Sequence, residues 1–253
     1  MSGARVVRRS VPSSKRIMIG AGRYVLVPVQ PRPADIPVAT WQELARLNDY
    51  VIDHVRYDRS RVGAAARRAD RHQTPAETLR IGRGVCQDFT ALFEALAAER
   101  GHTVRSLRSA RLNHAWNEVL IAGRWWVVDV TWNSAELFLG GARVPERVRS
   151  DPDFRKRYFL TTVEREEALQ RAGLLRETHR APDVARVDYA RTSEAYAILD
   201  ILSPLVARRN ALVASRTATR REIDGLDARI VDLHRRYRVL AQAHPLAVRY
   251  TLT

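Results

Sequence analysis

The chain of 253 residues is poor in three features: it has one cysteine, two lysines and no long apolar segment. A lone cysteine, Cys86, cannot form an internal disulfide, so a secreted disulfide scaffold is excluded. No apolar run approaches the roughly 18 residues that span a bilayer. Pro12 and Lys15 interrupt the segment where a signal peptide would have its apolar core. These absences predict a cytoplasmic protein that does not contact a membrane.

The basic residues are almost all arginine, and the formal net charge is +15 at pH 7. Residues 1–33 carry seven basic side chains and no acidic one, whereas residues 74–133 are close to neutral. Such charge favours acidic partners, and a solvated arginine-rich surface is the alternative. Nucleic-acid binding is disfavoured because the sequence has no interleaved aromatic residues, zinc-ligand pattern or helix-turn-helix signal.

Three regions are expected along the chain. Residues 1–33 are predicted to be a basic, flexible arm with a short strand in RYVLVPVQP. Residues 34–190 hold the best-patterned helices and strands and are predicted to form the catalytic domain. Within them Thr40 and Glu43 have the spacing of a capping box, as do Thr74 and Glu77 around Pro75. The arginine-rich residues 58–73 are expected to form an exposed loop.

Residues 191–253 are predicted to be helical, with two apolar stripes. Pro204 interrupts the first stripe and is expected to start a new helix. The second stripe alternates by three and four residues from Ile223 to Leu240, as in a heptad seam. Two arrangements stay open for this extension: a helical hairpin within one chain, or a coiled coil that joins two chains in a homodimer.

Cys86 lies at the predicted start of a core helix. Gly82 and Gly84 precede it, and apolar residues recur at helical spacing from Phe89 to Ala97. A helix N-terminus stabilises a thiolate, and its N–H groups can hold the oxyanion that forms when a carbonyl is attacked. An inert core cysteine is the alternative reading of this residue taken by itself.

A predicted β-hairpin supplies the partners that a reactive thiol needs. The segments HAWNEVLI and RWWVVDVTW flank Ala122-Gly123, which has the form of a two-residue turn. If Ile121 pairs with Arg124, His114 lies opposite Thr131 and Asp129 is its diagonal neighbour on one face. A histidine can take the proton of the thiol, and a carboxylate can fix its tautomer. The sequence therefore predicts a triad of Cys86, His114 and Asp129.

Four neighbouring residues have candidate supporting roles. Gln87 supplies a first-turn N–H for an oxyanion, and Trp116 shares a face with His114, where it could wall the site or belong to the core. Asp88 is expected to cap the helix or to pair with an arginine. His179 is assigned a structural role. The other histidines form no metal-ligand spacing with the cysteine, so neither a metal nor an organic cofactor is expected.

The segments GRGVCQDFTALFEALAAERG and NHAWNEVLIAGRWWVVDVTWN resemble the transglutaminase-like superfamily of thiol enzymes, especially its bacterial members. The later RYFLTTVEREEA and THRAP also resemble that pattern, so the match covers about residues 40–182. The resemblance implies an α+β, papain-like core in which a catalytic helix packs on an antiparallel sheet. It implies Cys86 as nucleophile, His114 as base and Asp129 as the residue that orients the base.

The resemblance specifies a mechanism better than a reaction, because the superfamily includes peptidases, peptide N-glycanases, transglutaminases and condensing enzymes. We expect an amide bond of a peptide or protein to be attacked, with water as acceptor in a peptidase or amidase. An amine acceptor would make a transglutaminase or amide synthase. A calcium-activated cross-linker is disfavoured because the sequence has no carboxylate cluster for the metal. A non-catalytic module that binds acidic partners is the alternative of another class.

Overall fold

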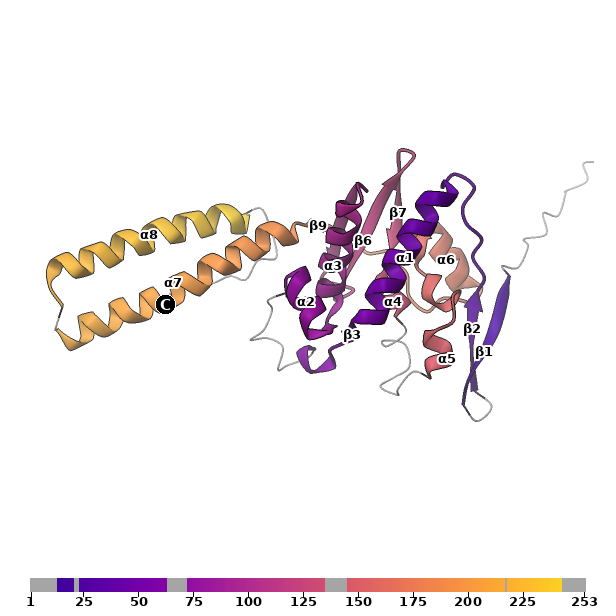
Figure 1. Ribbon diagram of the computed structural model, residues 1–253, viewed down its shortest axis with the longest axis horizontal. Coiled ribbons are helices and arrows are strands. Elements are labelled where there is room, and N and C mark those ends of the chain that lie inside the picture. The colour runs from indigo at the N-terminus through magenta and orange to yellow at the C-terminus, as the bar shows by residue number, and fades with distance from the viewer. Residues whose placement is uncertain (1–12, 21–22, 63–71, 135–144, 217, 243–253) are drawn as a thin grey trace, which may run out of the picture.

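The computed structural model describes residues 13–20, 23–62, 72–134, 145–216 and 218–242. Its architecture is α+β: helices pack on an antiparallel sheet, and a long helical hairpin extends to one side of that body (Figure 1). None of the helices among the described residues has both the length and the apolar character that crossing a bilayer requires. The helices packed on an antiparallel sheet and the C-terminal helical extension confirm the predicted α+β fold class.

Five strands form the main sheet, in the spatial order β8-β7-β6-β5-β9. Their bounds are Val104–Ser109 for β5, His114–Ile121 for β6, Arg124–Val128 for β7, Phe159–Thr161 for β8 and Ala185–Val187 for β9. Ile121 pairs with Arg124 across the β6–β7 turn, which confirms the predicted register. Ala122 and Gly123 both have positive φ, at 49° and 77°, as a tight turn of this kind requires.

The end of β7 differs from the prediction. The strand stops at Val128, and the next residues turn into the short helix α4 (Val130–Asn133). Thr131 is therefore helical and does not lie opposite His114. The physical reason is Asp129, whose side chain accepts the N–H of Trp132 at 2.8 Å and so caps the helix.

Helices α1 (Val38–His54) and α3 (Cys86–Glu99) bury their apolar faces against one side of the sheet. The shared core includes Leu44, Ile52, Phe89, Phe93, Val119 and Val128. The expected start of α1 at Thr40 is wrong: the helix begins at Val38, because the carbonyl of Pro37 already accepts the N–H of Trp41. Helix α2 (Pro75–Ile81) begins with the predicted capping box between Thr74 and Glu77.

The N-terminal arm is more ordered than predicted. Residues Ser14–Gly20 form β1, which pairs antiparallel with β2 (Arg23–Pro28). Ile17 and Val27 pack against Val148 and Phe154, which belong to α5 (Glu146–Arg149) and a 3₁₀ turn at Phe154–Lys156. Burial of this apolar surface ties residues 14–20 and 23–28 to the body, whereas we expected a flexible arm with one short strand. Residues 1–12 and 21–22 lie outside the described part.

The predicted loop at residues 58–73 is also partly structured. A 3₁₀ turn spans Arg59–Arg61, and His72 is buried between the rings of Tyr189 and Tyr196. Residues 63–71 lie outside the described residues.

Two long helices, α7 (Tyr189–Ser215) and α8 (Arg220–Gln242), form the hairpin (Figure 1). Leu199 and Leu202 of α7 pack against Leu233 and Tyr237 of α8, so the seam is used within the chain. Pro204 lies inside α7 and does not start a new helix. Apolar packing on both sides of it, through Leu202 and Leu205, keeps the helix continuous.

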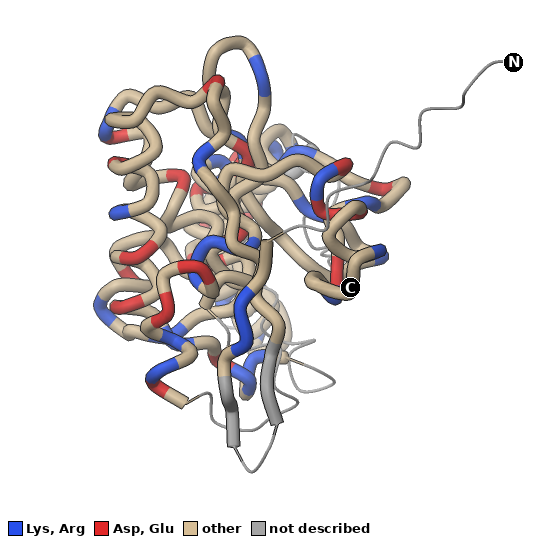
Figure 2. Tube along the Cα trace, turned by 90° about the vertical axis from the view of Figure 1, so that its right-hand side faces the viewer, with Lys and Arg blue, Asp and Glu red and all other residues tan. Residues whose placement is uncertain are grey.

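Basic and acidic residues are interleaved along the body in the view of Figure 2. Lys15 pairs with Asp151 at 2.7 Å and with Asp153 at 2.5 Å, and Arg209 of α7 pairs with Asp227 of α8 at 2.9 Å. Part of the positive charge is therefore used in contacts inside the molecule.

Candidate active site

Cys86 is the first residue of α3, where a short parallel strand pair leads into the helix. The strand β4 (Arg83–Gly84) pairs with β3 (Arg56–Tyr57), and Val85 is the N-cap. The first turn of an α-helix leaves N–H groups without intrahelical acceptors and carries the positive end of the helix dipole. The predicted position of Cys86 at the start of a helix is confirmed.

Asp88 fixes the start of this helix from inside the protein. Its buried carboxylate accepts the backbone N–H of Val85 at 2.7 Å and that of Gln73 at 2.6 Å, and it pairs with Arg61 at 2.5 Å. Burial raises the pKa of Asp88, and the two N–H donors and Arg61 oppose that rise. Both roles considered for Asp88, cap and arginine partner, are present together.

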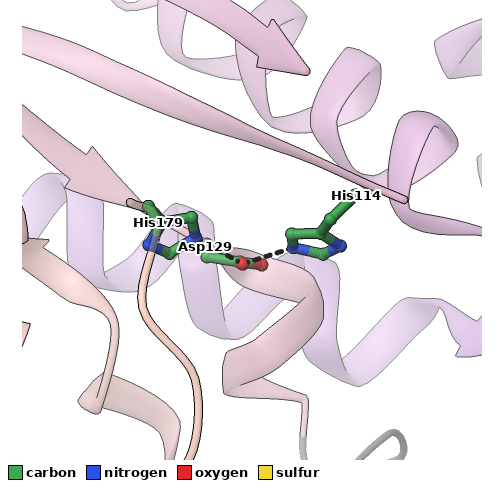
Figure 3. Close-up of side chains that lie close together, drawn as sticks. All are labelled: His114, Asp129 and His179. Atoms are coloured by element: carbon green, nitrogen blue, oxygen red, sulfur yellow. Dashed lines mark hydrogen bonds and ion pairs between the residues drawn. The ribbon is translucent and has the colours of Figure 1, made fainter. Parts of the chain in front are cut away.

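His114 and Asp129 meet beside this helix start (Figure 3). His114 is the first residue of β6, and Asp129 lies between β7 and α4. The Nε2 atom of His114 donates to Oδ2 of Asp129 at 2.6 Å, and both side chains are buried. The other carboxylate oxygen accepts from Trp132, and the backbone N–H of Asp129 donates to Tyr158, so the carboxylate is held in one orientation.

This arrangement leaves only Nδ1 of His114 for a further partner. Cys86 lies close enough for its sulfur to affect the pKa of the imidazole. Burial disfavours the charged imidazolium, but Asp129 and then Cys86 outweigh it and raise the pKa of His114 to about 10. Burial would likewise raise the pKa of Asp129, yet His114 and His179 hold it well below its usual range. The structure thus brings the three predicted triad residues into one cluster.

Two indole rings lie near the imidazole of His114, nearly parallel to it. The ring of Trp132 is stacked on it, with centroids 4.4 Å apart and planes 5° apart. Trp116 lies beyond, at 6.2 Å and 13°, and is 2% exposed. Stacking of this kind restricts rotation of the imidazole. Trp116 was expected beside the site, whereas Trp132 was missed because the sequence placed it in a strand.

The site also contains two buried residues that the predicted triad did not include. His179 Nε2 lies 2.9 Å from Oδ2 of Asp129, the same oxygen that His114 contacts (Figure 3). On the other side of the ring, Nδ1 lies 2.9 Å from Oε1 of Glu166, a residue of α6 (Val163–Arg171). Glu166 is fully buried. The sequence gave no indication of this burial, because an acidic residue in an amphipathic helix is usually exposed. His179 had been assigned a structural role.

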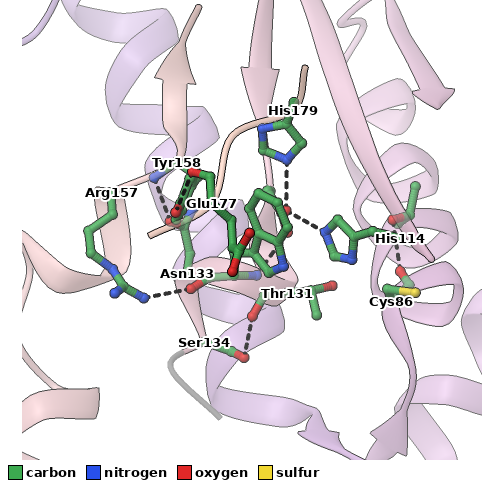
Figure 4. Close-up of polar contacts among 12 residues, drawn as sticks. Cys86, His114, Thr131, Asn133, Ser134, Arg157, Tyr158, Glu177 and His179 are labelled. Atoms are coloured by element: carbon green, nitrogen blue, oxygen red, sulfur yellow. Dashed lines mark hydrogen bonds and ion pairs between the residues drawn. The ribbon is translucent and has the colours of Figure 1, made fainter. Parts of the chain in front are cut away.

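Hydrogen bonds from the segment before β8 hold the surrounding turns in place (Figure 4). Arg157 Nη2 donates to the carbonyl of Trp132 at 2.7 Å, and the N–H of Tyr158 donates to Asn133 at 2.9 Å. The hydroxyl of Tyr158 donates to the carbonyl of Glu177 at 3.0 Å, two residues before His179. The turns that carry Asp129 and His179 are therefore both hydrogen-bonded to residues 157 and 158.

Gln87 is the second residue of α3 and is half-buried. Its N–H belongs to the same first turn as that of Cys86, since an α-helix leaves both without an intrahelical acceptor. Its contribution to an oxyanion site stays a prediction.

Ligand atoms of His114, Asp129 and His179 lie within 4.8 Å of one another, which raises the question of a metal. Both imidazoles, however, contact the same carboxylate oxygen at hydrogen-bonding distances of 2.6 and 2.9 Å. A metal ion would have to replace both bonds. We therefore assign the cluster as a hydrogen-bonded chain.

Residues 34–130 match the model of the transglutaminase-like superfamily. This segment is therefore similar to a transglutaminase-like domain. The match includes Cys86, His114 and Asp129 and ends before Glu166 and His179, so it covers only part of this site. The family match supports an enzyme of the transglutaminase-like kind.

Two curated proteins are similar to part of this chain. One is kyphoscoliosis peptidase of Homo sapiens, 32% identical over 101 residues, and the other is kyphoscoliosis peptidase of Mus musculus, 30% identical over 100 residues. Each alignment covers 34% of this chain and 14% of the relative, so the chain matches only a small part of their length. A solved structure of a candidate cysteine protease from Cytophaga hutchinsonii aligns with 35% of this chain and 30% of its own, at 24% identity and a TM-score of 0.28.

Proposed function

We propose that this protein is a thiol-dependent acyl-transfer enzyme that cleaves an amide bond of a peptide or protein, as a cysteine peptidase or amidase does. The observation that carries the proposal is the buried His114–Asp129 pair beside a cysteine at a helix N-terminus. A thiol, a base and a group that orients the base are what nucleophilic catalysis at a carbonyl requires.

In the first half of the reaction, His114 takes the proton of Cys86 at Nδ1, and the sulfur attacks the amide carbonyl. A C–S bond forms, and first-turn N–H groups of α3 stabilise the oxyanion. His114 then delivers its proton to the leaving nitrogen as the C–N bond breaks. Asp129 keeps the proton on Nε2 throughout, so that Nδ1 is the nitrogen that exchanges protons.

The second half consumes the acyl-thioester. Water attacks the thioester carbonyl, His114 accepts a proton from that water, and the C–S bond breaks to release an acid and the thiol. An amine in place of water would release an amide, and that reaction is the alternative within the same mechanism. We favour hydrolysis because the curated relatives are named peptidases.

Alkylation of the thiol tests the proposal without knowledge of the substrate. Cys86 is the single cysteine, so each equivalent of iodoacetamide found by intact-protein mass spectrometry reports on this residue. We expect alkylation at pH 6 to be at least about ten times faster than that of a small model thiol, because in the proposed mechanism His114 takes the proton of the thiol. His114→Gln should reduce the rate towards that of the model thiol.

His102→Gln is the matched control. His102 lies beyond the C-terminal end of α3, at the opposite end of that helix from Cys86, and its Nε2 atom is 3.0 Å from Oε2 of Glu43. It should leave the rate unchanged. Wild-type alkylation no faster than that of the model thiol would favour the other class of function, a module that binds acidic partners. If alkylation is fast, incubation with a peptide library, with and without added amine, would identify the acyl donor and the acceptor.

A further inference from the structure

The hydrogen-bonded chain does not end at Asp129. His179 places one ring nitrogen against Asp129 and the other against Glu166, both carboxylates being buried. We propose that His179 is a positioning residue, held as an imidazolium by Glu166. It orients Asp129 and weakens the effect that the negative charge of Asp129 has on His114. This inference rests on the proposed function, since it concerns the same thiol site.

The hydrogen-bond geometry requires two donors on the His179 ring. Asp129 Oδ2 at 2.9 Å and Glu166 Oε1 at 2.9 Å are both carboxylate oxygens, which accept and do not donate when ionised. A neutral imidazole has one N–H and could satisfy only one of them. The doubly protonated ring satisfies both, and it neutralises one of two buried negative charges that would otherwise be costly.

The groups that face His179 agree with this protonation state. Burial disfavours a charged ring, but Glu166 and Asp129 raise the pKa of His179 to about 9. Tyr158 approaches edge-on at 5.7 Å between centroids, and His114 lies at 6.1 Å. The remaining neighbours, Trp116 and Trp132, are uncharged, so the two carboxylates dominate.

The consequence for His114 follows from the distances. An imidazolium 6.1 Å from His114 opposes a second positive charge there. Glu166 has the opposite effect but lies on the far edge of the His179 ring, so it acts over a longer distance. The net effect of the pair is to lower the affinity of His114 for its proton. A less tightly held proton is transferred more readily to a leaving amine.

Glu166→Gln isolates the charge, because it preserves the bonding pattern. The backbone N–H of His179 donates to Glu166 Oε2 at 2.9 Å, so a glutamine can accept there and donate to Nδ1 with its amide. His179 can then be neutral and still donate from Nε2 to Asp129. We expect the pKa of His114, followed by NMR of histidine labelled with nitrogen-15, to rise by about one unit. We also expect His179 to carry two protons at pH 7 in the wild type and one in this variant.

Glu43→Gln is the matched control, since it removes the carboxylate of the His102–Glu43 pair, and it should leave His114 unchanged. An unchanged His114 titration in Glu166→Gln, or a singly protonated His179 in the wild type, would overturn the inference. The wild-type spectrum decides the second point even if the variant does not fold. Slow alkylation of Cys86 would instead contradict the proposed function, while the coupling between the two histidines would remain measurable.

Discussion

The Nε2 atom of His114 lies 2.6 Å from Oδ2 of Asp129, and this bond determines which nitrogen faces the thiol. Because Asp129 is fixed by the N–H of Trp132 and by a second imidazole, it cannot turn away from His114. In the proposed mechanism, Nδ1 is therefore the nitrogen that accepts the proton of Cys86.

Asp129→Asn should reverse the tautomer of His114. The asparagine oxygen can still accept the N–H of Trp132 and cap α4, but its amide group would donate where the carboxylate accepted. Nε2 of His114 would then be unprotonated and Nδ1 protonated, so the ring could not take a proton from the thiol. We expect turnover to fall by about 10³- to 10⁴-fold. Steady-state kinetics with circular dichroism as a check of folding would measure this, and wild-type rates would mean that another group orients His114.

Cys86→Ala should abolish turnover and leave the fold intact. The side chain is half-exposed at the first position of α3, where alanine is well tolerated. We expect the melting temperature to stay within a few degrees of the wild-type value. Residual turnover after removal of the lone thiol would exclude a thioester intermediate.

The sequence was sufficient to predict Cys86, His114 and the β6–β7 register, because these depend on local patterns. The Ala122-Gly123 turn sets the pairing of Ile121 with Arg124, and glycines before an amphipathic segment mark the start of α3. Asp129 was predicted next to His114 for an incomplete reason. It reaches the histidine from the cap of a helix, not from a continuing strand.

Glu166 and His179 could not be placed beside Asp129 from the sequence, because the residues they contact are distant along the chain. His179 meets Asp129 across 50 positions, and Glu166 meets His179 only through the fold of the segment after α6. The same reason explains why Pro204 does not start a new helix and why β1 and β2 are ordered. Packing against residues far away in sequence outweighed the local signal of a proline or of a run of basic residues.

The stability of the protein should decrease between pH 6.5 and about 9. In the folded state the pKa of His179 is raised from 6.5 to about 9, so its proton is retained where the unfolded chain has released it. The folded state then binds more protons than the unfolded state, so the free energy of unfolding falls as the pH rises through this range. Urea denaturation should show a gap between the wild type and His179→Gln that narrows by roughly 1 kcal/mol per pH unit. A constant gap would mean that His179 is neutral when folded.

Chelation should not affect the site. Both imidazoles use Nε2 to donate to one oxygen of Asp129, so the cluster is complete as a set of hydrogen bonds. We expect dialysis against EDTA to leave the alkylation rate of Cys86 and the melting temperature unchanged. Loss of either, with recovery on addition of zinc, would show that the cluster is a metal centre.

Gly84→Ala tests the close approach that sets the start of α3. A Cβ atom at residue 84 would lie 2.7 Å from Cβ of Asp88 and 3.1 Å from its Oδ2, closer than side chains pack. Asp88 would have to move, which weakens its bonds to Val85 and Gln73. We expect a loss of about 1–3 kcal/mol in the free energy of unfolding, together with slower alkylation of Cys86.

Gly225→Ala is the matched control, because a Cβ there meets nothing within 4 Å and the residue lies inside α8. It should stabilise the helix by about 0.5–1 kcal/mol and leave alkylation unchanged. Equal effects of the two substitutions on stability would show that Asp88 does not depend on the space beside Gly84. An unchanged alkylation rate in a destabilised Gly84→Ala protein would mean that the reactivity of Cys86 does not depend on the contacts of Asp88 at the start of α3.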